Sequence, residues 1–99
     1  MKNNIDEKTK KKIIGIIKVI FPEAKIYLFG SRAKSEHREF SDIDIAIDTG
    51  KKLSRFDVVE IADMLSASKI PFRIDVVDVH SVNEEMKNSI LQEGILWSN

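Results

Sequence analysis

The stretch Leu28-Phe-Gly-Ser-Arg-Ala-Lys-Ser-Glu-His-Arg-Glu-Phe-Ser-Asp-Ile-Asp-Ile-Ala-Ile47 decides how the rest of the chain is organised. An apolar run ends at Gly30 and Ser31, a polar connection follows, and an alternating segment opens with Asp42 and Asp44. A glycine in this place allows a sharp turn and lets backbone N–H groups approach a ligand closely. If residues 31–34 form the first turn of a short helix, its free N–H groups and dipole favour an anion. The stretch therefore predicts a phosphate-binding turn beside two carboxylates.

Two strands flank this turn. Residues 25–29 are apolar on both sides and rich in aromatic and branched side chains, which is typical of a central strand covered on two faces. Residues 42–48 alternate strictly, so their three isoleucines share one face and are predicted to form core. The opposite face carries Asp42 and Asp44. We expect this acidic face to lie beside the turn.

Amphipathic segments predict helices at 6–20, 54–68 and 81–93, the last ending at Gly94. Two pairs of residues have the spacing of a capping box: Ser54 with Asp57, and Ser81 with Glu84. The apolar residues expected to pack are Phe56, Val59, Ile61, Ala62 and Leu65 in the second segment, and Met86, Ile90 and Leu91 in the third.

A third strand is predicted over residues 72–79, where Asp75 interrupts an otherwise apolar run. An acid buried within a strand is costly unless it is paired or bound to a cation. The chain ends in an apolar tail, Ile95-Leu96-Trp97, for which three roles are open. Core packing is the first expectation, and addition to a sheet edge or binding of a partner are the alternatives.

Composition sets the class of protein. Residues 1–99 suffice for a single domain with one core. Sixteen basic and sixteen acidic residues give zero formal net charge, so strong nucleic-acid or membrane-surface binding is not expected, and any anion site must be local. The chain has no cysteine, no signal-like N-terminus and no apolar run long enough to cross a membrane. We expect a cytoplasmic protein.

The acids suggest a chemistry. Residues two apart on a strand lie about 6.6–6.8 Å apart on the same face, so Asp42 and Asp44 can converge. Carboxylates about 5 Å apart repel by roughly 3 kcal/mol at an effective dielectric near 20, so a positive group is expected between them. A lysine, an arginine or a hard divalent ion such as magnesium would serve. Asp75 can join them if its strand is adjacent, which would complete a two-metal phosphoryl or nucleotidyl transfer site.

These motifs resemble the minimal nucleotidyltransferases of the DNA polymerase β superfamily, which include the antitoxins paired with HEPN-domain toxins. The resemblance is carried by Gly30-Ser31-Arg32-Ala33, by Ser41-Asp42-Ile43-Asp44-Ile45, and by Asp75 within Arg73-Ile74-Asp75-Val76-Val77. Where that family often has a glycine shortly after the arginine, this chain has Ser35. The resemblance spans most of the chain and implies an α/β (α+β) fold with a mixed β-sheet flanked by helices.

The resemblance also implies a site and a reaction. Asp42, Asp44 and Asp75 would bind two Mg²⁺ ions, and Asp75 would help to activate an acceptor hydroxyl. Gly30 and Ser31 would hold the triphosphate of ATP or another nucleoside triphosphate, while Arg32 would contact phosphate or support the loop. The expected acceptor is a hydroxyl of a HEPN toxin, since 99 residues leave no second domain for an acceptor.

Two other functions are compatible with this sequence. The first alternative is a binding module that neutralises a toxin by contact, which the apolar C-terminal tail favours. The second is the catalytic subunit of a small-molecule nucleotidyltransferase. His37 and His80 are expected to be solvated or structural.

Overall fold

The computed structural model describes residues 5–34 and 42–99, so the expected loop with His37, together with Ser41, lies outside the described residues. The elements follow in the order α1 (Glu7–Ile20), β1 (Lys25–Phe29), β2 (Ile43–Asp48), α2 (Arg55–Ala67), β3 (Ile74–Asp78), α3 (Glu84–Glu93) and β4 (Ile95–Ser98). Within the described residues, no helix combines the length and hydrophobicity that crossing a membrane requires.

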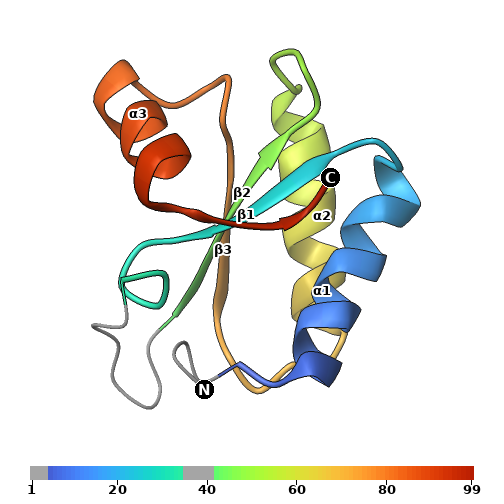
Figure 1. The fold of residues 1–99 in the computed structure, drawn as a ribbon. Coiled ribbons are helices and arrows are strands. Elements are labelled where there is room, and N and C mark those ends of the chain that lie inside the picture. The colour runs from blue at the N-terminus through green and yellow to red at the C-terminus, as the bar shows by residue number, and fades with distance from the viewer. Residues whose placement is uncertain (1–4, 35–41) are drawn as a thin grey trace.

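The strands form one mixed sheet in the order β3-β2-β1-β4. β1 is antiparallel to both β2 and β4, whereas β2 and β3 run parallel and are joined through α2. Figure 1 shows α1 and α2 on one side of this sheet and α3 on the other. The predicted mixed sheet flanked by helices and the internal position of β1 are confirmed.

The main core lies between the sheet and the helix pair α1 and α2. Ile43, Ile45 and Ile47 of β2 are fully buried there, as the alternation predicted. A smaller cluster fills the other face under α3, where Ala46 packs with Val79 and Ile90. The acidic face of β2 is therefore covered by α3 at Ala46 and is less enclosed at Asp44.

The packing faces of two helices differ from the prediction. In α2, Ile61 and Leu65 are buried, but the Phe56 side chain is 86% exposed and Val59 is 51% exposed. Five residues along a helix amount to about 140° of rotation, so Phe56 projects away from the face on which Ile61 packs. In α3, Ile90 is buried, whereas Met86 and Leu91 stay exposed.

The helix ends are capped by short polar side chains. Ser54 accepts a hydrogen bond from the backbone N–H of Asp57, as predicted, and Asp6 caps α1 by accepting one from the N–H of Thr9. The predicted cap of α3 is wrong, because Asn83 accepts the bond from the Met86 N–H at 2.8 Å. Ser81 instead donates its hydroxyl to buried Asp78 at 2.7 Å, since a buried carboxylate needs hydrogen-bond donors.

The C-terminal tail both extends the sheet and packs on the core. β4 pairs with β1, and Trp97 is buried beneath it with the Lys10 ammonium 5.7 Å from the ring centroid. Leu96, on the alternate side, is 46% exposed. Core packing and sheet addition thus occur together, with Trp97 facing inward.

Candidate active site

Gly30 forms the turn that follows β1, and its φ of 75° lies in the left-handed region that favours glycine. β1 and β2 are paired so that Phe29 lies opposite Asp44. A Cβ built on Gly30 would collide with Oδ2 of Asp44. The backbone of the turn and the Asp44 carboxylate are therefore in direct contact. Residues 31–34 form a single turn, closed by a 3.3 Å bond from the Lys34 N–H to the Gly30 carbonyl.

Asp44 also lies beside the other two predicted acids. The parallel register of β2 and β3 pairs Asp44 with Asp75, and Asp42 precedes it by two residues on the same side of the chain. Burial raises the pKa of the Asp44 carboxyl, the charges of Asp75 and Asp42 raise it further, and Arg32 partly opposes them. The three carboxylates therefore act on one another.

Asp75 is more open than the sequence predicted. The expectation of a buried acid is wrong, because the Asp75 side chain is 45% exposed. Its Oδ1 lies 3.5 Å from Nε of Arg73, whose side chain is 77% exposed. Such an exposed ion pair contributes little to stability, about 0–1 kcal/mol. Asp75 is thus held loosely at the solvent side of the site.

Arg32 supplies the positive charge that the paired acids require. Its side chain is 1% exposed, and its guanidinium carbon lies 4.7 Å from the centroid of the Phe72 ring. Burial lowers the pKa of Arg32, while the charges of Asp42 and Asp44 act in the opposite direction. A guanidinium nevertheless stays protonated in proteins. Its burial beside the acids favours a supporting role over open contact with phosphate.

Phe72 lies beside this site through its contact with Arg32. Alternation along residues 72–79 places it on the face of Ile74 and Val76, and all three side chains pack against the main core. Stacking of a cation on an aromatic ring contributes about 0.5–2 kcal/mol. No local pattern connects Phe72 with Arg32, because forty positions of sequence separate them.

The carboxylate groups of Asp42, Asp44 and Asp75 are suitable ligands for a hard divalent cation. Carboxylate oxygens are the ligands that Mg²⁺ prefers, and the pKa of Asp44 is raised first by burial and then by the neighbouring charges of Asp75 and Asp42. Within residues 5–34 and 42–99, however, no three acidic or histidine side chains come together closely enough to form a complete ligand set. The pairing of Asp75 with Arg73 is consistent with this separation.

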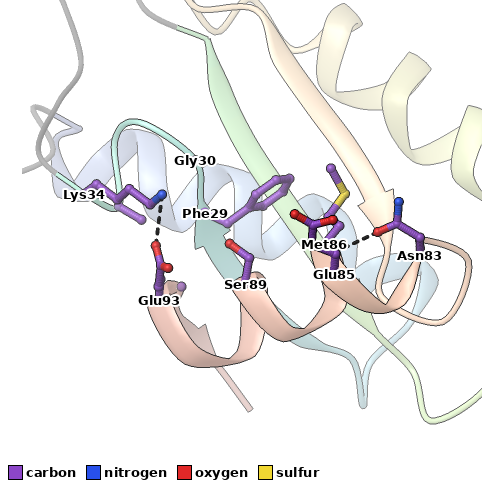
Figure 2. Close-up of a pocket in the computed structure, with 10 residues that line it drawn as sticks. Phe29, Gly30, Lys34, Asn83, Glu85, Met86, Ser89 and Glu93 are labelled. Atoms are coloured by element: carbon purple, nitrogen blue, oxygen red, sulfur yellow. Dashed lines mark hydrogen bonds and ion pairs between the residues drawn. The ribbon is translucent and has the colours of Figure 1, made fainter.

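A cavity of about 350 Å³ opens between the Gly30 turn and α3 (Figure 2). Its lining residues are Phe29, Gly30, Ala33, Lys34, Asn83, Glu85, Met86, Ser89, Glu93 and Gly94. One side is closed by an ion pair between Lys34 Nζ and Glu93 Oε2 at 2.9 Å. The sequence did not predict this cavity, because it forms only when α3 returns across the sheet to β1.

A separate polar cluster occupies the far end of β2. His80 Nε2 lies 2.7 Å from Oδ1 of Asp48, and the Gly50 N–H donates to the same oxygen at 2.8 Å. Burial on its own would raise the pKa of Asp48, but the bonds from Gly50 and His80 and the charges of His80 and Lys25 hold it below its usual value. Asp48 and Asp44 are four residues apart on β2, roughly 13 Å, so this cluster is separate from the candidate site.

Comparison with known proteins identifies the family of this chain. The family model described as polymerase beta nucleotidyltransferase matches residues 11–98. The chain belongs to the polymerase beta nucleotidyltransferase family. Nucleotidyltransferases of this family generally use divalent metal ions.

Several family members are similar over most of this nucleotidyltransferase chain. The protein adenylyltransferase MntA of Shewanella oneidensis is 32% identical over 90 residues, covering 89% of this chain and 64% of that protein. A protein of Methanocaldococcus jannaschii, provisionally assigned as a protein adenylyltransferase, is 34% identical over 92 residues, covering 93% of this chain and 96% of that protein. The match to a probable MntA of Haemophilus influenzae covers 66% of that relative. The nucleotidyltransferase thus spans about two thirds of the length of the two MntA relatives.

A solved structure has the same fold. It is a complex of a tri-AMPylated Shewanella oneidensis HEPN toxin with an MNT antitoxin. The similarity has a TM-score of 0.72 at 26% identity, and it covers 91% of this nucleotidyltransferase and 69% of the solved chain.

Proposed function

We propose that this chain transfers AMP from ATP to a hydroxyl group of a partner protein, as the antitoxin of a HEPN toxin. The observation that carries the proposal is the position of Asp44, which touches the Gly30 turn and lies beside Asp42 and Asp75. A phosphate-binding turn with three carboxylates beside it supplies the parts that nucleotidyl transfer needs. The names of the MntA relatives and the AMPylated toxin of the related complex support this choice of reaction and partner.

Each residue has a defined part in the proposed reaction. Backbone N–H groups at Gly30 and Ser31 bind the triphosphate, and buried Arg32 holds Asp42 and Asp44 in place. Asp42, Asp44 and Asp75 would hold two Mg²⁺ ions. When bound, these ions would neutralise charge on the triphosphate and on the departing pyrophosphate.

The transfer is a displacement at the α-phosphorus of ATP. The acceptor hydroxyl oxygen forms a bond to that phosphorus, and the bond from the phosphorus to the oxygen bridging the α and β phosphates breaks. Pyrophosphate leaves with the electrons of that bond, and the hydroxyl proton passes to the Asp75 carboxylate. Because the Asp75 side chain is 45% exposed, it is open to an incoming hydroxyl and can pass the proton on to water.

The acceptor is proposed to be a protein in the cytoplasm. Zero formal net charge leaves no general attraction for nucleic acid. The absence of cysteine and the use of ATP fit a reducing compartment. The HEPN toxin of the related complex carries AMP groups, which makes a HEPN protein encoded beside this chain the first acceptor to test.

Labelling tests the proposal directly. Incubation with ATP labelled at the α-phosphate, Mg²⁺ and the neighbouring gene product should place label on that protein. The Asp44→Asn variant should transfer no label, whereas Glu60→Gln, at an exposed acid on α2, should match the wild type. Absence of label with every nucleotide and divalent ion would contradict the proposal. Label on a small molecule, with none on protein, would favour the small-molecule nucleotidyltransferase.

A contact-only antitoxin is the second candidate. The observation that favours it is the exposed apolar side chains of Leu91, Ile95 and Leu96 at the end of α3 and on β4, which are 40–46% exposed. If Asp42→Asn and Asp44→Asn variants still neutralised the toxin fully in growing cells, contact would suffice. Loss of neutralisation in folded variants would assign the protection to chemistry.

A further inference from the structure

The cavity beside the turn continues from the proposed triphosphate site. Gly30 is part of both, because its backbone forms the turn and also lines the cavity. Pockets for small molecules typically measure about 300–1,000 Å³, and this cavity of about 350 Å³ falls at the lower end of that range. A nucleotide whose phosphates are held at Gly30 therefore has space for its remaining part between the turn and α3.

The wall of the cavity suits a flat ring. Figure 2 shows Phe29 of β1 and Met86 of α3 projecting toward the same space, and Ala33 lines it from the turn. Aromatic, thioether and methyl groups pack well against the faces of a planar base. Met86 is 41% exposed in this chain, so a ring placed against it would cover apolar surface now facing solvent.

The charges of the cavity orient a nucleotide within it. Glu85 and Glu93 project from α3, whereas Lys34 projects from the turn and pairs with Glu93 at 2.9 Å. A triphosphate is repelled by Glu85 and Glu93, whereas at the turn backbone N–H groups favour it and the Mg²⁺ ions that the three proposed aspartate ligands would hold would offset the charge of those acids. An uncharged base has no such penalty. The phosphates are thus directed to Gly30 and the base toward Glu85.

We infer that this cavity holds the nucleoside of the bound nucleotide and that Glu85 selects bases with an exocyclic amino group. An ionised carboxylate only accepts hydrogen bonds. Adenine presents its exocyclic amino group, which can donate to the carboxylate, whereas uracil has the O4 carbonyl oxygen at the corresponding position, which only accepts. The neighbouring N3–H of uracil can donate, but it lies between two carbonyl oxygens that the carboxylate repels. The hydroxyl of Ser89 both donates and accepts hydrogen bonds, so it does not discriminate between bases in this way. The inference rests on the proposed nucleotide site and adds the position and selection of the base.

A cavity-filling pair of variants tests the location. Ser89 and Asn88 are neighbouring exposed residues of α3, but only Ser89 lines the cavity. In the 99-residue chain with Mg²⁺, Ser89→Leu should weaken ATP binding about tenfold or more, a change that corresponds to about 1.4 kcal/mol. Its binding of inorganic triphosphate should stay unchanged. The matched Asn88→Leu variant should bind both ligands like the wild type.

A second pair tests the selection by Glu85. Calorimetric titration of ATP and UTP gives the ratio of their affinities for each variant. Glu85→Gln should reduce the preference for ATP about tenfold, because its amide can donate to a uracil carbonyl and the charge-assisted bond is lost. Glu84→Gln removes a neighbouring charge from the same first turn of α3, outside the cavity, and should keep the wild-type ratio.

The outcomes separate this inference from the proposed function. If wild-type chain binds ATP but Ser89→Leu and Asn88→Leu bind it equally, the base lies elsewhere and the inference is overturned while the proposed site stands. An unchanged ratio of ATP to UTP affinity in Glu85→Gln overturns the selection. If the wild type binds neither ATP nor inorganic triphosphate, the proposed nucleotide site fails, and the inference fails with it.

Discussion

Asp44 Oδ2 occupies the space that a Cβ on residue 30 would need, so the acid of β2 and the turn after β1 are fitted to one another. Gly30 is also in the left-handed region, with φ at 75°. Both features require glycine. They place a carboxylate in contact with the backbone that would bind phosphate.

Gly30→Ala should therefore impair both the fold and the site. We expect a loss of about 1–2 kcal/mol in the free energy of unfolding from the left-handed backbone, and a further loss from the clash with Asp44. Transfer of labelled AMP should fall at least tenfold. Gly50→Ala is the matched control, because Gly50 has φ at 86° but nothing within 4 Å of the added Cβ. Equal loss of activity in both variants would show that the contact with Asp44 is irrelevant.

Asp44→Asn should abolish transfer and stabilise the fold at neutral pH. Burial, Asp75 and Asp42 raise the pKa of Asp44, so the folded chain binds a proton there more tightly than the unfolded chain does. The ionised carboxylate consequently lowers the free energy of unfolding. This loss of stability is absent below about pH 4, the pKa of Asp in the unfolded chain, and reaches its full size above the raised pKa of the folded chain. Denaturant titrations at pH 4 and pH 8 should show that the free energy of unfolding of the variant, relative to that of the wild type, is higher at pH 8 than at pH 4. A variant that is less stable than the wild type at pH 8 would contradict this account.

Mg²⁺ should stabilise the wild-type chain against heat. A ligand that binds the folded state alone raises the free energy of unfolding by RT ln(1 + [L]/Kd), about 2.7 kcal/mol at a concentration of 100 Kd. Removal of the ion with EDTA should reverse the shift, and Asp44→Asn should show little shift. An equal rise in melting temperature in both proteins would place the ion elsewhere.

Phe72→Leu tests the support of Arg32. The change removes a ring 4.7 Å from the guanidinium carbon while leaving the charge, and it should cost about 1–3 kcal/mol of stability. Transfer should fall about tenfold, since Arg32 is then less firmly held beside Asp42 and Asp44. Phe56→Leu, at an 86% exposed position, should change stability by less than about 0.5 kcal/mol. Full activity in Phe72→Leu would show that the stacking does not position Arg32.

Asp48→Asn should destabilise the fold without affecting transfer. Its pKa is held below the usual value, so its contribution to stability is present above about pH 4 and is lost as the pH falls through the folded pKa. At pH 7 the loss should be about 1–3 kcal/mol, because its bonds to His80 and Gly50 involve an ionised group. The difference from the wild type should shrink at pH 3. A loss of transfer in a variant that remains folded would show that the two ends of β2 are coupled.

Local periodicity was sufficient for most of the fold. The strict alternation of β2 predicted three buried isoleucines, and all of them are fully buried. The capping side chain of Ser54 also lies where its spacing indicates. Such patterns are reliable because they depend on the geometry of one element. The prediction failed at Phe56 and at the cap of α3, where neighbouring elements decide which side is buried and which polar group must be satisfied.

The sequence by itself determined the composition of the candidate site: a glycine-serine turn, two acids on one strand face, and a third acid on a later strand. Only the tertiary structure decided how these parts are supported. The stacking of Arg32 on Phe72, the openness of Asp75 and the cavity under α3 all arise from elements that are distant along the chain. The physical reason is that a local pattern specifies the direction of a side chain within its own element, whereas its neighbours, charge environment and enclosing walls depend on how the elements pack.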